Sequence, residues 1–457
     1  MLPMRCLWFV FLLVLALPLC AADLRIHGSN TVGERLAPAL VSEWLRAEGY
    51  REITSEETAF EETLIQATRD GQRISIEIHA HGSGTSARDL IAGVADIGMS
   101  SRPITPAEAE AAKAAGLGQL NEPKHELVLA LDGLSVVVHP DSPLLHLEKE
   151  TIRRLFSGQI TDWSQLGLRA GRIALHARDD KSGTWDSFRA MVLGSSPLSP
   201  RAQRYESTAR LAAAVARDPL AIGFVGMSEV KGVKALAISD GAPPVTPDAF
   251  HVAVEDYPLS RRLYFYVPAA TSELARRFIA YALSDAAQAS VERIGFVSQY
   301  VTPYPAVARG DAPADYRDIV HGAERLSLNF RFGSGSSFLD SKALRDVDRL
   351  TQFMQQPENA GRELRLIGFA DADEVLPYSA WSLSNDRADF IAEVLGVRNV
   401  PVARVRGMGG AVPVAANDSE IGRNRNRRVE VWLAEKPTHT ATAAQLGSAA
   451  SGAPALP

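Results

Sequence analysis

The stretch RISIEIHAHGSGTSARDLIAGVADIGMSSRPI, residues 73–104, decides the fold of the first half of the chain. Isoleucines alternate with polar residues over 74–78, a pattern that predicts a half-buried strand. GSGTS at 82–86 then forms a turn into a helix that continues through Leu90, and ADIGMSSRP provides a second strand. Strands that alternate with helices in this way indicate an α/β fold with ligands bound at the C-terminal ends of parallel strands.

Two other segments repeat the order of strand, polar turn and helix. The segment that begins DLRIHGSNTV predicts a strand at 24–27 and a turn at 28–31, followed by an amphipathic helix. ARDDKSGTWDSF at 177–188 places Ser, Gly and Thr before a third predicted helix. One such turn is an ordinary helix cap. Three of them predict a site for a small oxyanion, because helix N-termini carry unpaired N–H groups and a partial positive charge.

The N-terminus predicts export. The chain has 457 residues, a length that favours two or three domains, and its formal charge of −6 gives no reason to expect nucleic acid as a partner. Residues 1–22 have the pattern of a secretory signal peptide, with an apolar run at 7–19 and cleavage expected after Ala22. Both cysteines, Cys6 and Cys20, fall inside this signal. A lipidated Cys20 is the alternative to a cleaved, soluble product.

The composition changes after Tyr300 and predicts a domain boundary. We expect a first domain over 23–303, and residues 304–322, with several prolines and no sustained apolar period, predict a flexible linker. Strand-like and helix-like segments alternate over 323–436 and predict a second globular domain. The low-complexity tail, residues 437–457, is expected to be disordered.

Eight segments of the first domain resemble, in order, segments of the phosphate-specific (Pst) periplasmic substrate-binding proteins. The resemblance implies a two-lobed, type II-like periplasmic-binding-protein fold that closes over phosphate, with no enzymatic activity and no cofactor. It also implies that two strands cross between the lobes, at 129–140 and 259–268. The segments are IHGSNTV, HGSGTS, ADIGMSSRPI, GLSVVVHPDSP, IRRLFSGQITDWSQLG, RDDKSGTWDSF, DPLAIGFVGMSEV and YPLSRRLYFYV.

The same resemblance implies the phosphate ligands. Arg178 would be the one fixed full charge, with Asp180 orienting its guanidinium group. The alternative for this pair is a local surface ion pair of little energetic value. The other residues expected to contact phosphate come from the polar turns and are Ser29, Asn30, Thr31, Ser83, Thr85, Ser101, Ser182, Gly183 and Thr184.

Ser101 departs from part of the family. Some members carry an aspartate there, which accepts the proton of hydrogen phosphate and so rejects sulfate. Ser101 can accept or donate a hydrogen bond, and this leaves open a receptor for another oxyanion such as sulfate.

His79, His81 and Glu77 share one face of a predicted strand and raise the question of a metal site. We interpret them as a polar strand face and predict no metal. No Gly-x-Ser-x-Gly elbow is present, so the sequence gives no sign of a nucleophilic triad.

The second domain resembles the OmpA-like C-terminal domain, which binds peptidoglycan. The segments that carry this resemblance are LNFRFGSGSSFL, LIGFADADE, LSNDRADFIAEVLGV and RGMGGAVPVAANDSEIGRNRNRRVEVWL. It implies an α+β fold in which Asp371 and Arg387 clasp the zwitterionic end of diaminopimelate in the wall peptide. Ala370, Glu374 and Ala380 depart from the family pattern, and the spacing from Asp371 to Arg387 is one residue longer. Loss of wall binding on an intact fold is therefore the alternative.

Together these features predict a periplasmic phosphate-binding protein of a Gram-negative bacterium, tethered to peptidoglycan. Its expected role is phosphate capture for transport or sensing, with an ABC permease or an envelope sensor as partner. The alternative is a structural or adhesion protein of the envelope whose clamp no longer binds a ligand.

Overall fold

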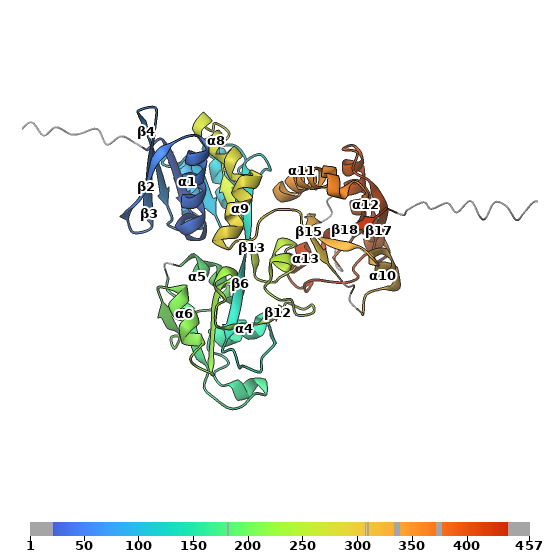
Figure 1. Ribbon diagram of the computed structural model, residues 1–457. Coiled ribbons are helices and arrows are strands. Elements are labelled where there is room, and N and C mark those ends of the chain that lie inside the picture. The colour runs from blue at the N-terminus through green and yellow to red at the C-terminus, as the bar shows by residue number, and fades with distance from the viewer. Residues whose placement is uncertain are drawn as a thin grey trace, which may run out of the picture.

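The computed structural model describes residues 22–180, 182–306, 308, 310–332, 339–371 and 377–436. These residues form two lobes, one above the other in Figure 1, and a third body beside them. Within these ranges, no helix is both long and apolar enough to cross a membrane. The expected signal peptide, apart from its last residue, and the expected tail lie outside the described residues.

The first lobe is built on a mixed sheet with strand order β2-β3-β4-β1-β5-β13. β1 is parallel to both of its neighbours, β4 and β5, as the alternation of strands and helices predicted. β2 and β3 form an antiparallel hairpin that the sequence analysis did not identify. The bounds of the strands before the crossing are β1 Leu24–Gly28, β2 Arg51–Ala59, β3 Glu62–Arg69, β4 Gln72–His79 and β5 Ile97–Ser100.

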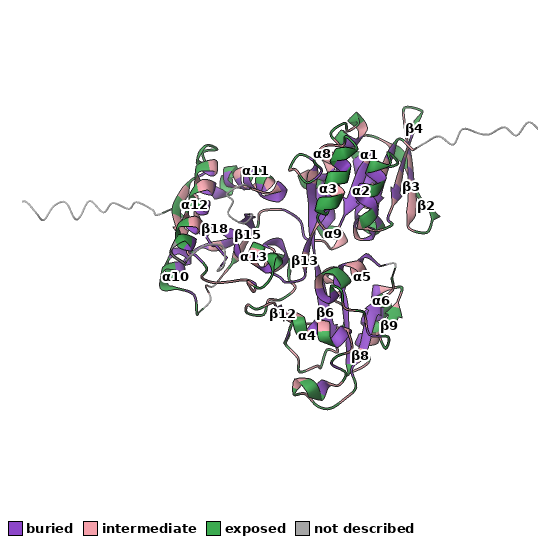
Figure 2. Cartoon of the chain, turned by 180° about the vertical axis from the view of Figure 1, so that it is seen from behind, coloured by how far each residue is buried: buried purple, intermediate pink, exposed green. Residues whose placement is uncertain are grey.

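Helices cover both faces of this sheet. α1, α8 and α9 contribute apolar side chains to the main core of the lobe, and α2 and α3 contribute to a smaller cluster on the other face. Figure 2 shows the strands mostly buried and the outward sides of the helices exposed. The bounds are η1 Val32–Leu36, α1 Ala37–Ala47, α2 Ser83–Ile91, α3 Pro106–Ala114, α8 Glu273–Ala282 and α9 Asp285–Ile294.

The second lobe repeats the layered arrangement on a smaller scale. Its sheet continues the strand order through β6-β10-β8-β9, with the short strand β11 (Lys234–Ala235) paired to β6. α4 and α5 pack on one face, and α6 packs on the other. The bounds of its longer elements are α4 Lys149–Phe156, β8 Ala174–Arg178, α5 Gly183–Phe188, β9 Gln203–Tyr205, α6 Thr208–Val215, β10 Ala221–Gly226 and α7 Ala249–Ala253.

Two long antiparallel strands, β6 (Glu126–Val138) and β13 (Ser260–Tyr266), cross between the lobes. The first half of β6 lies in the core of the first lobe, and its second half lies in the core of the second. β13 also pairs with β5 of the first lobe. The expected two crossing strands are thus confirmed, and the fold class of a two-lobed α/β binding protein with them.

The third body is a separate α+β domain with strand order β14-β15-β18-β16-β17. α11 and α12 contribute to one apolar cluster of this domain, and α10 contributes to another. The bounds are β14 Pro303–Pro305, α10 Ala314–Val320, β15 Glu324–Arg331, α11 Ser341–Gln355, β16 Arg362–Gly368, α12 Pro377–Gly396, β17 Val402–Gly407, α13 Glu420–Asn426 and β18 Arg428–Glu435.

The segment 304–322 differs from the flexible linker that its prolines predicted. β14 pairs with β15, and α10 buries Tyr316, Ile319 and Val320 against aromatic side chains of the third body. These apolar residues recur at helical spacing within a short segment, too short to stand out beside the prolines. The described part of this segment is therefore structurally part of the third body.

The third body contacts both lobes. Ser341 Oγ, at the start of α11, donates to Glu126 Oε1 of β6 at 2.6 Å on the side of the first lobe. On the side of the second lobe, Arg425 Nη2 donates to the carbonyl oxygen of Pro258 at 2.6 Å and Arg425 Nη1 lies 3.4 Å from Asp240 Oδ2. A body that is bonded to both lobes restricts how they can move relative to each other.

Candidate functional site

The first polar turn follows β1 and is held tightly against β5. A Cβ atom on Gly28, where φ is +142°, would lie 2.0 Å from the carbonyl oxygen of Met99, so only glycine fits there. The amide of Ser29 then donates to that same carbonyl at 3.0 Å. Ser29 and Asn30 are buried at the start of the helical segment that continues into α1. The turn is fixed in place before any ligand binds.

The second turn meets the end of β5. Ser83 Oγ, at the first residue of α2, accepts a hydrogen bond from the amide of Ser101 at 3.0 Å, and the two hydroxyl oxygens lie 3.2 Å apart. Thr85 has a different role, because its hydroxyl donates to the carbonyl oxygen of Gly82 at 3.0 Å and so closes the turn. The structure therefore brings together Ser83 and Ser101, two of the residues expected to contact phosphate.

The third turn comes from the second lobe. Ser182 Oγ accepts from the amide of Trp185 at 3.4 Å, as an ordinary N-cap does. Gly183 follows, and a Cβ atom there would lie 2.4 Å from Thr31 Oγ1 and 2.7 Å from the amide nitrogen of Thr31. Thr184 is half-buried beside it. The structure thus brings the first turn, in one lobe, against the third turn, in the other.

The Thr31 hydroxyl at this contact is one of several buried polar atoms that lack a hydrogen-bond partner in the described part of the chain. Buried polar atoms are nearly always paired, because an unpaired one costs about 1–3 kcal/mol. A ligand that accepts a hydrogen bond between the lobes would remove this cost.

Arg178 and Asp180 do not form the expected pair. Arg178 donates to the carbonyl oxygens of Tyr205 and Glu206, at 3.2 and 2.9 Å, and to the hydroxyl of Thr208. Asp180 is exposed and instead accepts from Arg204 Nη2 at 2.6 Å. The reason is that β9 runs parallel to β8, and this pairing was not visible from the sequence.

A second arginine, which the sequence analysis did not single out, stands at the lobe contact. Arg261 of β13 is buried and forms an ion pair with Asp132 of β6, with Nη2 2.6 Å from Oδ2. Its Nη1 also donates to the carbonyl oxygen of Gly183 at 3.3 Å. Two adjacent arginines inside the apolar crossing segment 259–268 were the available signal. The pair links both crossing strands to the third turn.

Asp186 is a further carboxylate that sequence reasoning missed. Its Oδ2 lies 4.0 Å from where a Cβ atom of Gly82 would be, so the side chain of α5 reaches toward the second turn. Burial raises the pKa of Asp186, although Arg189 and Arg261 oppose that shift. A carboxylate here can accept a proton from a ligand held at Ser83.

A cavity of about 1040 Å³ opens where the two lobes and the third body meet. Ser83, Ser101 and Asp186 line it, and positive side chains outnumber carboxylates seven to four. Several of the seven are paired with carboxylates outside the lining, such as Arg261 with Asp132 and Arg425 with Asp240, so the count does not give a net positive charge. The seven are Arg102, Lys149, Arg189, Arg261, Arg262, Arg331 and Arg425.

The two residues expected to bind wall peptide are both fully buried in the third body. Asp371 Oδ2 accepts from Arg427 Nη1 at 2.9 Å, and Arg387 of α12 stands over the ring of Phe332, 5.3 Å from its centroid. Arg427 belongs to the closing Gly-Arg-x-x-Asn-Arg-Arg run, but its pairing with Asp371 was not predicted. Among the departures from the family pattern, Glu374 lies outside the described residues.

Comparison with known proteins places the chain in a class first. A family model described as a PBP superfamily domain matches residues 54–286, slightly more than half of the chain, and a model of the OmpA family matches residues 331–427. The chain is thus a substrate-binding protein rather than an enzyme, with a second, OmpA-type domain. It belongs to the family of the PstS and SphX proteins.

The relatives that establish the family of this chain share 30% of their aligned residues with it. The chain is 30% identical to the phosphate-binding protein PstS of Bacillus subtilis over 218 residues, 47% of this chain and 68% of the relative. It is 30% identical to protein SphX of Synechococcus elongatus over 287 residues, 60% of this chain and 82% of the relative. A solved structure, an ABC-type phosphate transport receptor from Vibrio cholerae, matches 60% of this chain and 99% of its own length at 26% identity, with a TM-score of 0.49.

Proposed function

We propose that the chain binds inorganic phosphate between its two lobes and that its OmpA-like domain holds it at peptidoglycan. The observation that carries the first part is the buried, unpartnered Thr31 hydroxyl at the contact with Gly183. Relatives of this chain are named phosphate-binding proteins, which supports the same ligand.

Recognition would rest mainly on neutral donors. Phosphate at this contact meets the turns that contain Ser29 to Thr31, Ser83 and Ser182 to Thr184, and the N-terminus of α2 adds a favourable partial charge. Arg261, tied to Gly183, supplies fixed positive charge at the crossing strands. Arg178 would have to exchange its present contacts with the β9 segment to reach the anion, so we assign it a secondary role.

Selectivity would come from Asp186 rather than from Ser101. Hydrogen phosphate carries a proton that a carboxylate can accept, whereas sulfate presents only oxygens that a carboxylate repels. Asp186 faces the second turn from the opposite lobe, so it can supply the carboxylate that some family members carry at the position of Ser101. This arrangement favours phosphate over sulfate.

Wall binding would use the carboxylate of Asp371 for the ammonium group of diaminopimelate and Arg387 for its carboxylate. Both side chains are buried, so the peptide end would have to enter the domain. A clamp held at the wall suits local capture of phosphate, with delivery to an ABC permease or readout by an envelope sensor. No uptake step is assigned to the chain itself.

Calorimetric titration of the chain without residues 1–22 tests phosphate binding. We expect saturable binding of phosphate, none of sulfate, and at least tenfold weaker phosphate binding in Thr31→Val. Thr351→Val, the same change in α11, is the matched control and should bind as the parent does. Absence of heat with either anion from the folded protein would refute the clamp.

Sedimentation with purified peptidoglycan tests the anchor separately. Asp371→Asn should leave the protein in the supernatant, while Asp348→Asn, an exposed residue of α11, should sediment with the wall. If Asp371→Asn sediments with the wall as fully as Asp348→Asn does, the assignment of Asp371 is refuted.

A further inference from the structure

Three neighbouring strands of the first lobe place a row of histidines and glutamates side by side. His79 of β4 pairs in register with His27 of β1 on one side and with Glu62 of β3 on the other. The sequence showed only that Glu77, His79 and His81 share a strand face. The sheet adds His27 and Glu62 to that face.

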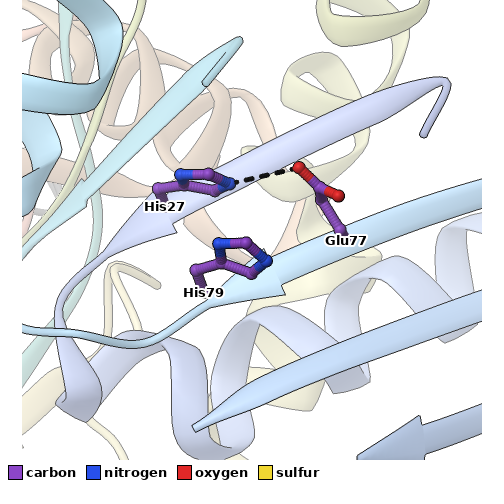
Figure 3. A group of neighbouring side chains, drawn as sticks. All are labelled: His27, Glu77 and His79. Carbon is purple, nitrogen blue, oxygen red and sulfur yellow. Dashed lines mark hydrogen bonds and ion pairs between the residues drawn. The ribbon is translucent and has the colours of Figure 1, made fainter. Parts of the chain in front are cut away.

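Two groups in the described part of the chain bring three candidate metal ligands close together, and they share His79. In His27, Glu77 and His79, one candidate ligand atom from each residue lies within 4.8 Å of the others, and the same holds for Glu62, His79 and His81. Figure 3 shows the His27 and His79 rings one above the other, with Glu77 beside them. Their centroids are 4.1 Å apart.

His27 is held in the orientation that a metal ligand needs. Its Nδ1 lies 3.1 Å from Asp89 Oδ2, and its Nε2 lies 3.4 Å from Glu77 Oε1. Asp89 is buried on α2, and a carboxylate on one ring nitrogen is the usual way of fixing a histidine whose other nitrogen binds a metal. His27 itself is also buried.

Two carboxylates, Asp89 and Glu77, lie beside the two ring nitrogens of His27. A neutral imidazole has one N–H, so it can donate to Asp89 or to Glu77 but not to both. The remaining contact needs either a second proton on His27 or a cation beside Nε2 and Glu77. The two arginines nearby, Arg25 and Arg88, are already paired with Asp96 and Asp89.

We propose that His27, Glu77 and His79 bind one divalent transition metal ion, zinc by the chemistry of the donors. Two imidazoles and a carboxylate form a common zinc donor set, with a fourth position left for water. The separation of His27 Nε2 from Glu77 Oε1, 3.4 Å, already matches the roughly 3.3 Å between ligands of a tetrahedral ion with bonds of about 2.0–2.1 Å.

The location gives this site a defined effect. His27 directly precedes the turn at Gly28 to Thr31, and His79 lies three residues before Gly82, which begins the second turn. An ion bound to both would fix the C-terminal ends of β1 and β4 relative to each other. The two turns of the first lobe that line the lobe contact would then be held at a constant separation.

Titration of the untagged chain with zinc chloride, and with cobalt(II) as an absorbing probe, tests the proposal. We expect one equivalent to bind with a Kd of micromolar or tighter, with the visible absorption of tetrahedral cobalt. His79→Ala should weaken binding at least a hundredfold and Glu77→Gln at least tenfold. A variant that lacks the buried His27 ring can fail to fold. Glu77 is only half-buried, so Glu77→Gln tests the site without that risk.

His251→Ala is the matched control. His251 also lies beside a carboxylate, with Nδ1 2.7 Å from Asp248 Oδ2, but belongs to neither group of three. Its loss should leave zinc binding unchanged. No saturable binding below 100 µM in the folded chain would overturn the proposal, as would equal weakening by His251→Ala. Loss of binding in His81→Ala with retention in His27→Ala would overturn the assignment to His27.

Discussion

Arg262 Nη1 donates to Asp340 Oδ2 at 2.7 Å, so a strand that crosses between the lobes is ion-paired with the residue that caps α11 of the OmpA-like domain. The same guanidinium group contacts Glu255, with Nε 2.5 Å from Oε1, and both side chains are largely buried. Breaking a buried pair from one side costs about 3–5 kcal/mol. Glu255 belongs to the same domain as Arg262, whereas Asp340 is 37% exposed, so the pair that joins the two domains contributes less than this.

Asp340→Ala should weaken that contact and lower the thermal midpoint of the chain, because Arg262 loses a partner and α11 loses its cap, which also accepts from the amide of Ala343 at 2.8 Å. Scanning calorimetry measures the change. Asp348→Ala, an exposed residue of the same helix, is the control. Equal midpoints for the two variants would show that the contact contributes little.

Acid should destabilise the same contact. Burial alone would raise the pKa of Glu255, but Arg262 and Arg331 outweigh it and hold that pKa well below its usual range. A carboxylate whose pKa is depressed by folding gives stability that is complete above its unfolded value of about 4.3 and is lost as the pH falls below it.

We therefore expect the thermal midpoint to fall as the pH is lowered from about 5 to 3, and to fall less in Glu255→Gln. Glu358→Gln, on the surface of the OmpA-like domain, should keep the full dependence of the parent. A Glu255→Gln profile parallel to that of the parent would contradict the assignment.

Gly183→Ala should prevent the lobes from closing. A Cβ atom there meets both the hydroxyl and the amide nitrogen of Thr31, and the backbone atom cannot move aside without displacing the turn. We expect phosphate binding at least tenfold weaker, measured by calorimetry, with little change in the thermal midpoint. Gly361→Ala, where a Cβ atom meets nothing within 4 Å, should bind normally. Normal binding by Gly183→Ala would mean that phosphate does not need this contact.

Asp186→Asn should relax selectivity, because the amide no longer repels sulfate and offers its own N–H donors. We expect measurable sulfate binding to appear and phosphate binding to weaken about tenfold. Asp180→Asn is the comparison, since Asp180 is exposed and pairs with Arg204. If Asp180→Asn admits sulfate and Asp186→Asn does not, the pairing of Asp180 with Arg204 does not persist in the phosphate-bound state.

Much of the fold followed from local patterns. The alternating isoleucines of β4, the three polar turns and the crossing segments were all placed correctly, because each is encoded in a continuous stretch. The hairpin of β2 and β3 was missed, and so was the helix α10, because neither has an apolar period long enough to identify it.

The candidate site was predictable only in part, for a physical reason. Polar turns can be recognised in the sequence by their Ser, Thr and Gly residues. Which residues meet across a sheet depends on strand register, which the sequence of one strand does not give. Arg178 turns to the β9 segment and Arg261 turns to Asp132 because of which strands lie beside theirs. The row of His27, His79 and Glu62 likewise exists only once three strands are aligned.

The short path between the clamp and the OmpA-like domain has a hydrodynamic consequence. Val297 is still bonded to β6, while the carbonyl oxygen of Tyr300 accepts from Ser327 Oγ of β15 at 2.8 Å and the carbonyl oxygen of Thr302 accepts from the amide of Ser327 at 3.0 Å. With so little free chain between them, the two parts rotate as one particle, and a fluorescent probe on either should report the same correlation time. If the chain is anchored at peptidoglycan as we propose, a permease would have to come within the particle's own dimensions, because the described chain that joins the two parts is short.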